Sequence, residues 1–232
     1  MLGGNRLISA LRERGKKLFV LTNNSTDSVD TVRSHLARFG IDVSPNEILT
    51  SARLTAEYLA ARRGPVTYFL VGERGLEAEM ESFGHVRTDG ESADCVVVGL
   101  DRSLSYEKLD HAARLVRGGA SIIATHRARL YMYKIGPAVG AGPIVRAIEY
   151  ATGRRATVIG KPSRLMFAMA LKKSGCRSVD AVMVGDQVET DILGAYRAGI
   201  DAILVKSGVD KDPNGYPVLA SVLNVDDISG FL

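Results

Sequence analysis

The sequence predicts an α/β protein with parallel sheets, and three observations lead to that prediction. Short apolar runs alternate with amphipathic stretches along nearly the whole chain. The runs at residues 18–21 and 95–100 are almost continuously apolar, which is typical of parallel strands covered on both faces. Several helical stretches end at a glycine, as at Gly15 and Gly40, so each helix has a clear stop before the next strand.

Taken in order, the apolar periodicity predicts seven strands and eight helices. The strands are expected at residues 18–21, 67–71, 95–100, 121–125, 157–160, 181–184 and 202–205. The helices are expected at about residues 7–14, from the cap at 25–27 to 39, and at 52–63, 75–83, 106–116, 143–152, 164–172 and 190–198. This is more strand than one compact sheet needs, so we expect a discontinuous Rossmann-like core, residues 1–51 and 154–232, and an inserted α/β cap, residues 52–153.

Composition excludes several classes of protein. The net charge of +4 comes from 30 basic and 26 acidic residues that are scattered along 232 residues, without the basic stripe and interleaved aromatics of a nucleic-acid face. No apolar run reaches the roughly 18 residues of a membrane span, and the first residues lack a signal peptide, so a cytoplasmic protein is expected. Cys95 and Cys176 form neither a disulfide framework nor a zinc site.

The first candidate site is acidic and follows an apolar strand. Residues 182–184 lead into Gly185 and Asp186, and Asp191 comes five residues later, where a helix begins. Two carboxylates on a short arc suit Mg²⁺ with its remaining waters. The alternative is that Asp186 caps a turn and Asp191 complements the amino end of the helix.

Two further segments could bind an anion. Thr22, Asn23, Asn24 and Ser25 place a hydroxyl, amides and backbone N–H groups before a helix, although loop capping explains them equally well. Lys161 lies between a strand and a helix, where it can neutralise a phosphate or remain a solvated lysine.

Other residues have weaker claims to chemistry. Gly136, Gly140 and Gly142 lack the spacing of a nucleotide-binding loop, so an ordinary flexible loop is expected there. His126 ends a strand, where a structural histidine is the favoured interpretation and a catalytic one the alternative.

Residues 21–25, Gly160-Lys161-Pro162 and residues 185–191, in this order, resemble the motifs of the haloacid dehalogenase superfamily, in particular its sugar-phosphate and nitrophenyl phosphatases with a large α/β cap. The resemblance implies phosphomonoester hydrolysis through a phosphoaspartyl intermediate with Mg²⁺. It also implies that Thr22, Asn23 and Asn24 hold the phosphoryl group and that Lys161 neutralises it. Asp186 would ligate the metal, and Asp191 would belong to the metal site and support it.

The chain departs from that family in two places. No strand ending in Asp-x-Asp, which supplies the attacking aspartate, precedes Thr22, and the first acidic residue is Glu13 within a helix. The core sheet is therefore expected to lack its usual first, central strand. Relatives carry an Asn and an Asp after the cap strand, where this chain has His126 and Ala128. In the next loop, Tyr131, Tyr133 and Lys134 could select the substrate, and ordinary packing of the cap is the alternative interpretation.

Three hypotheses follow for function. The first is a phosphatase whose longer form carries the aspartate, so that the 232 residues alone are inactive. The second is a non-catalytic relative that binds phosphate and metal, and the third is a fragment without function. The expected partner is a small phosphorylated substrate, with no nucleic acid and no membrane, and a homodimer through the cap is one assembly open to the chain.

Overall fold

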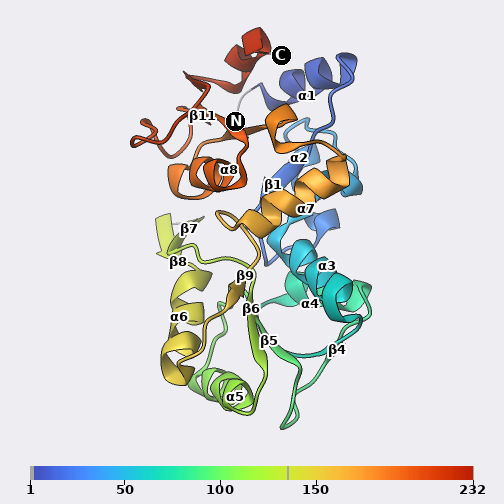
Figure 1. Ribbon diagram of the computed structural model, residues 1–232, viewed down its shortest axis with the longest axis vertical. Helices are drawn as coiled ribbons and strands as arrows, with labels where there is room; N and C mark the ends of the chain where they lie inside the picture. Colours follow the sequence, from blue (N-terminus) through green and yellow to red (C-terminus); the bar gives the residue numbers. More distant parts are fainter. Residues whose placement is uncertain (1–2, 135, 232) are drawn as a thin grey trace. The chain divides into compact units, whose positions relative to one another are not determined.

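The computed structural model describes residues 3–134 and 136–231, and the chain divides into two compact units. The first unit contains Met1–Val20, Val32–Ile48 and Lys161–Leu232, and the second contains Leu21–Thr31 and Leu49–Gly160. The expected cap, residues 52–153, lies within the second unit. The expected domain boundaries themselves stay a prediction. Both units alternate strands with helices, so the predicted α/β fold class is confirmed (Figure 1).

The second unit is built on a five-stranded parallel sheet. Its strand order is β4 (Val86–Arg87), β3 (Thr67–Val71), β5 (Cys95–Val98), β6 (Ser121–Ala124) and β9 (Thr157–Val158). In the register, Val71 lies beside Val98 and Val98 beside Ala124. Every residue of β5 is buried, as expected for a central strand covered on both faces.

Alternating side chains of this sheet pack into two layers. Phe69 and Val71 join buried residues of α5 (Tyr106–Arg117) and α6 (Ala141–Thr152) in one hydrophobic cluster, so these helices cover one face (Figure 1). Tyr68 and Leu70 point to the opposite face and are also buried. The helices α3 (Ser51–Arg63) and α4 (Arg74–Ser82), which pack on each other, belong to the same unit.

The glycine-containing segment after β6 is more ordered than expected. The strands β7 (Leu130–Tyr133) and β8 (Gly136–Val139) form an antiparallel pair, and α6 follows at once. A Cβ at Gly140 would lie 2.3 Å from the Ala128 carbonyl oxygen, and one at Gly142 would lie 2.6 Å from the Arg127 carbonyl oxygen. These glycines permit close backbone contact. The expectation of a flexible loop was therefore wrong here.

The first unit contains a three-stranded parallel sheet in the order β10 (Val182–Gly185), β11 (Asp201–Val205) and β12 (Ala220–Val222). Ile203 and Val205 pack with the C-terminal 3₁₀-helix η4 (Val225–Phe231) and with Leu7 of α1 (Gly4–Glu13). The helices α7 (Arg164–Ser174) and α8 (Leu193–Ala198) contact each other, with Phe167 packed against Gly194. The sequence pattern did not predict β12, β4 or the hairpin.

The remaining strands form a small sheet of their own. β1 (Val20–Thr22) pairs with β2 (Ile48–Thr50), which follows α2 (Val29–Ala37) and the short helix η1 (Pro45–Glu47). Within the described residues, no strand joins the β1–β2 pair to the sheet of β10, β11 and β12. The strands β1, β2, β10, β11 and β12 thus lie in two separate sheets. None of the described helices combines the length and apolar character needed to cross a bilayer.

Candidate functional site

A buried ion pair links two of the predicted site residues. Lys161 Nζ lies 2.6 Å from Asp191 Oδ1, with the two side chains 11% and 5% exposed. Lys161 comes just before α7, whose first turn is capped by Ser163: its Oγ accepts a hydrogen bond from the Leu165 N–H at 3.3 Å. Burial of the pair strengthens the attraction between the two charges. The pair therefore holds the ammonium group beside the loop that follows β10.

Asp191 also shapes that loop. Its Oδ2 accepts hydrogen bonds from the backbone N–H groups of Asp186 and Gln187, each at 3.2 Å. A Cβ on Gly185 would lie 2.4 Å from Asp191 Oδ2, so a glycine is needed for this close approach. Asp191 lies in a π-helical turn, Val188–Ile192, which precedes α8. The helix expected from residue 190 thus begins in a wider turn, a geometry frequent at functional sites.

Asp186 is held from a second direction by the loop after β11. The backbone N–H of Val209 donates to Asp186 Oδ2 at 3.1 Å, and the N–H of Asp210 donates to the Asp186 carbonyl oxygen at 2.9 Å. A Cβ on Gly208 would lie 2.1 Å from Asp186 Oδ2, so Gly208 leaves space for this carboxylate. Asp186 is half-buried, which leaves it accessible to a ligand.

Asp210 is a site residue that the sequence reasoning missed. Its Oδ2 accepts a hydrogen bond from the Val188 N–H at 2.6 Å, at the start of the π-helical turn. β10 and β11 are parallel neighbours, with Gly185 beside Leu204, so their following loops leave the same edge of the sheet. An acidic residue soon after the second strand was the available signal.

The donors around Asp186 are compatible with Mg²⁺. In the part of the chain that the structure describes, no three His, Cys, Asp or Glu side chains gather into a ready-made metal cage. Mg²⁺, however, is usually bound by one or two carboxylates, with water and substrate phosphate completing its octahedral shell. Asp186 fits that pattern, whereas both oxygens of Asp191 already receive hydrogen bonds or the Lys161 ion pair.

The threonine segment lies in the second unit. Thr22 ends β1, and its Oγ1 accepts a hydrogen bond from the Asn24 N–H at 3.1 Å. Asn24 Oδ1 accepts from the N–H groups of Thr26 and Asp27, both at 2.9 Å, so loop capping is the role seen for this side chain. Ser51 Oγ donates to the carbonyl oxygen of Asn23 at 2.9 Å. These bonds hold the loop in one conformation.

Gly160 packs directly against Asn23. A Cβ at position 160 would lie 2.5 Å from Asn23 Oδ1 and 2.5 Å from the Thr125 carbonyl oxygen, which already accepts the Gly160 N–H at 2.7 Å. His126, which follows Thr125 in the chain, is 6% exposed, and its Nδ1 lies 3.0 Å from Thr125 Oγ1. Burial lowers the pKa of His126 to about 4, so the ring is neutral near pH 7. Its position agrees with the structural role.

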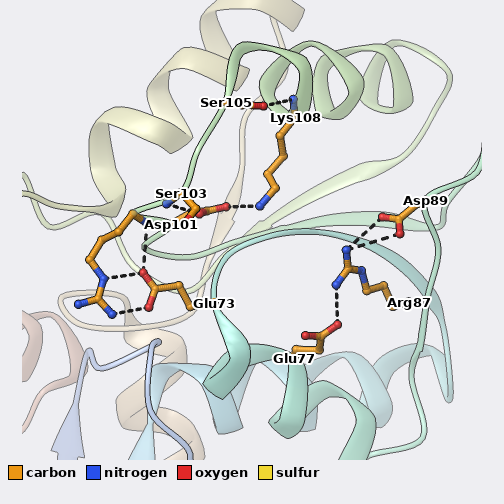
Figure 2. Close-up of polar contacts among 9 residues, drawn as sticks. Glu73, Glu77, Arg87, Asp89, Asp101, Ser103, Ser105 and Lys108 are labelled. Carbon is orange, nitrogen blue, oxygen red and sulfur yellow. Dashed lines mark hydrogen bonds and ion pairs between the residues drawn. The ribbon is translucent and has the colours of Figure 1, made fainter.

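One ion pair ties the loop after β3 to the loop after β5, and a second ties the loop after β5 to α5 (Figure 2). Arg102 Nε donates to Glu73 Oε1 at 2.7 Å, and this hydrogen bond lowers the pKa of Glu73. Lys108 Nζ donates to the buried Asp101 Oδ2 at 2.7 Å. The Arg102 guanidinium also lies 5.7 Å from the centre of the Tyr133 ring. Of the residues suggested for substrate selection, Tyr133 is therefore placed beside a charged side chain.

The structure thus brings together Lys161, Asp186 and Asp191 in the first unit. Thr22, Asn23 and Asn24 lie together in the second unit. The roles predicted for these six residues stay predictions.

Known proteins are similar to this chain in both sequence and fold. Residues 2–86 match the haloacid dehalogenase-like hydrolase family, and residues 158–228 match a second HAD-hydrolase-like family. Haloacid dehalogenase-like hydrolase domain-containing protein 2 of Bos taurus is 37% identical over 207 residues, which are 89% of this chain and 77% of that protein. The acid sugar phosphatase of Staphylococcus aureus is 34% identical over 89% of this chain and 80% of its own.

Solved structures agree. The p-nitrophenyl phosphatase of Archaeoglobus fulgidus is 30% identical, with a TM-score of 0.93 over 100% of this chain and 92% of its own. A thermostable NPPase double mutant from Geobacillus stearothermophilus is 33% identical, with a TM-score of 0.93 over 98% and 92% of the two chains. The chain belongs to the haloacid dehalogenase-like hydrolases, and the resemblance to the phosphatase branch is confirmed.

Proposed function

We propose that this chain serves the Mg²⁺-dependent hydrolysis of small phosphate monoesters. The observation that carries the proposal is the buried Lys161–Asp191 pair beside Asp186, at the carboxyl end of β10. Carboxyl ends of parallel strands are the usual ligand sites of α/β proteins. The names of the relatives, which include acid sugar phosphatase and p-nitrophenyl phosphatase, support the same class of reaction.

Each residue then has a defined role. In the first unit, Lys161 neutralises the negative charge of a phosphoryl group. In the second unit, Thr22, Asn23 and Asn24 are the candidates for binding phosphoryl oxygens. Asp186 holds Mg²⁺, and Asp191 orients both Lys161 and the Asp186 loop. The metal supplies charge neutralisation as the phosphoryl group transfers. In the net reaction the ester P–O bond breaks, a water oxygen bonds to phosphorus, and an alcohol and inorganic phosphate leave.

The phosphoaspartyl route adds one requirement. It needs an attacking aspartate carboxylate, which forms an acyl phosphate that water then cleaves. None of the six residues named above supplies that carboxylate. The proposal for Lys161 and Asp186 therefore concerns binding and charge stabilisation, which can be tested apart from turnover.

The experiment assays purified residues 1–232 with p-nitrophenyl phosphate and MgCl₂. Release of nitrophenol that is lost in Asp186→Ala but kept in Asp201→Ala, an exposed aspartate at the start of β11, supports the phosphatase. Turnover that Asp186→Ala leaves unchanged contradicts the assigned metal role. Addition of EDTA and then of MgCl₂ checks that the activity follows the metal.

The second candidate is a non-catalytic protein that binds phosphate and Mg²⁺. The buried ion pair of Lys161 with Asp191 supports this function as much as it supports a phosphatase. Calorimetric titration with inorganic phosphate separates the two. Binding that is weakened by Lys161→Met, without any turnover, supports the binder. A homodimer through the cap and a cytoplasmic location stay predictions, and sedimentation analysis tests the dimer.

A further inference from the structure

A hollow in the second unit has a lining rich in arginine. It encloses about 230 Å³ at the carboxyl end of α6, between the helix and the loop to β9. The hollow is lined by Arg146, Glu149, Tyr150, Gly153, Arg154 and Arg155. None of these residues has a role in the proposed phosphatase site.

Glu149 acts as a buried anchor for the arginines around it. Its side chain is 3% exposed, and its Oε2 lies 3.3 Å from Arg146 Nη1 and 3.8 Å from Arg155 Nη1. Its Oε1 contacts Arg127 and accepts the backbone N–H of Ala156 at 2.8 Å. Arg146 and Arg155 remain 61% and 75% exposed. The anchor therefore orients two guanidinium groups whose outer N–H groups still face solvent.

The charge balance of the hollow is positive. Burial alone would raise the pKa of Glu149, but the Ala156 N–H and the arginines lower it below the ordinary value, so the group is ionised. The lining then contains one carboxylate and three guanidinium groups, those of Arg146, Arg154 and Arg155, which leaves an excess of two positive charges. The carbonyl groups at the end of α6 oppose an anion, but the helix dipole amounts to only about half a charge there.

The shape and chemistry of the lining identify the class of ligand. Guanidinium groups bind phosphate oxygens through paired N–H donors, and oriented groups lose less entropy on binding. Tyr150 adds a ring that is 94% exposed at the rim. We propose that this hollow binds the phosphate group of a small phosphorylated molecule, at a site distinct from Lys161 and Asp186. The proposal does not depend on whether the chain is a phosphatase.

The test titrates inorganic pyrophosphate into residues 1–232 by calorimetry in EDTA, which removes divalent metals. The probe is added to the wild type, to Arg154→Gln/Arg155→Gln, and to the matched control Arg62→Gln/Arg63→Gln. The control pair is also two adjacent exposed arginines, at the end of α3. We expect the Kd to rise about tenfold or more in the first variant and less than about twofold in the control. Lys161→Met removes binding at the site of Lys161 and Asp186, so the heat that remains in this variant comes from pyrophosphate bound in the hollow.

Equal Kd values in wild type and Arg154→Gln/Arg155→Gln would overturn the proposal, as would the absence of binding at millimolar pyrophosphate. A nuclear magnetic resonance titration of the wild type gives a readout without a variant: the Nε–H signals of Arg146, Arg154 and Arg155 should shift together, and unchanged signals would contradict the site. AMP and ribose 5-phosphate separate two sources of phosphate. Tighter AMP binding would assign the base to the Tyr150 ring, and equal binding would leave phosphate as the recognised group.

Discussion

Lys161 Nζ and Asp191 Oδ1 lie 2.6 Å apart, and both side chains are almost completely buried. The same aspartate accepts the backbone N–H groups of Asp186 and Gln187. One carboxylate therefore fixes both Lys161, which the sequence places after one strand, and the loop that carries Asp186, which follows another strand. This arrangement makes several outcomes measurable.

Asp191→Asn should destabilise the protein strongly, because it removes the carboxylate charge that pairs with the buried Lys161 ammonium group. We expect the free energy of unfolding to fall by about 3 kcal/mol. Urea denaturation at neutral pH measures the change. Asp180→Asn is the control, since its pair with Arg177 is exposed and screened by solvent and should contribute little to stability. If the two substitutions lowered the free energy of unfolding equally, the buried pair would contribute no more to stability than the exposed one.

Asp210→Ala should loosen the start of the π-helical turn, because Val188 loses a charged hydrogen-bond acceptor at 2.6 Å. A hydrogen bond to a charged group contributes about 1.5–3 kcal/mol. Hydrogen exchange of the Val188 amide should therefore become at least tenfold faster, while Asp210→Asn, which keeps an acceptor, has a smaller effect. The comparison variant Asp212→Ala removes only an exposed turn contact to Asn214. Unchanged exchange at Val188 would contradict the role of Asp210.

Gly160→Ala should lower stability by overpacking. The new methyl group would lie 2.5 Å from Asn23 Oδ1 and from the Thr125 carbonyl oxygen, so the backbone must move. A cost of about 1–3 kcal/mol is expected, measured as a decrease in Tm. Gly90→Ala places its methyl group against a single side-chain atom, the Thr88 hydroxyl at 3.2 Å, and should change Tm little. A Gly160→Ala protein with the wild-type Tm would refute the close contact.

Acidification should destabilise the protein through His126. Its pKa is about 4 in the folded protein and about 6.5 when unfolded, so the unfolded state binds more protons between these values. Stability contributed by the neutral ring is present above pH 6.5 and is lost as the pH falls toward 4, by roughly 3 kcal/mol. Tm measured between pH 7.5 and 4.5 should fall less in His126→Asn than in the wild type. His35 is exposed, so His35→Asn should show the same decrease of Tm with falling pH as the wild type. The same decrease in His126→Asn would contradict the proposed contribution of His126.

The sequence by itself determined the α/β class and most of the regular elements. Apolar runs such as residues 95–98 and glycine stops such as Gly15 are local signals, so β5 lies where it was expected and α1 ends within one residue of its expected end. The motifs at Thr22, Lys161 and Asp186 were equally visible, because each follows a strand. A strand end is marked by its immediate neighbours in the chain.

Only the tertiary structure decided which side chains meet. Asp210 is 22 residues from Val188, and its place soon after a strand does not show which loop it contacts. The parallel pairing of β10 and β11 brings the two loops to one sheet edge. The hairpin of β7 and β8 was missed for the same reason. The glycines in and after the hairpin indicate a flexible loop when the local sequence alone is considered. In the folded chain, however, the backbone of residues 127–129 lies so close to Gly140 and Gly142 that a side chain would not fit there.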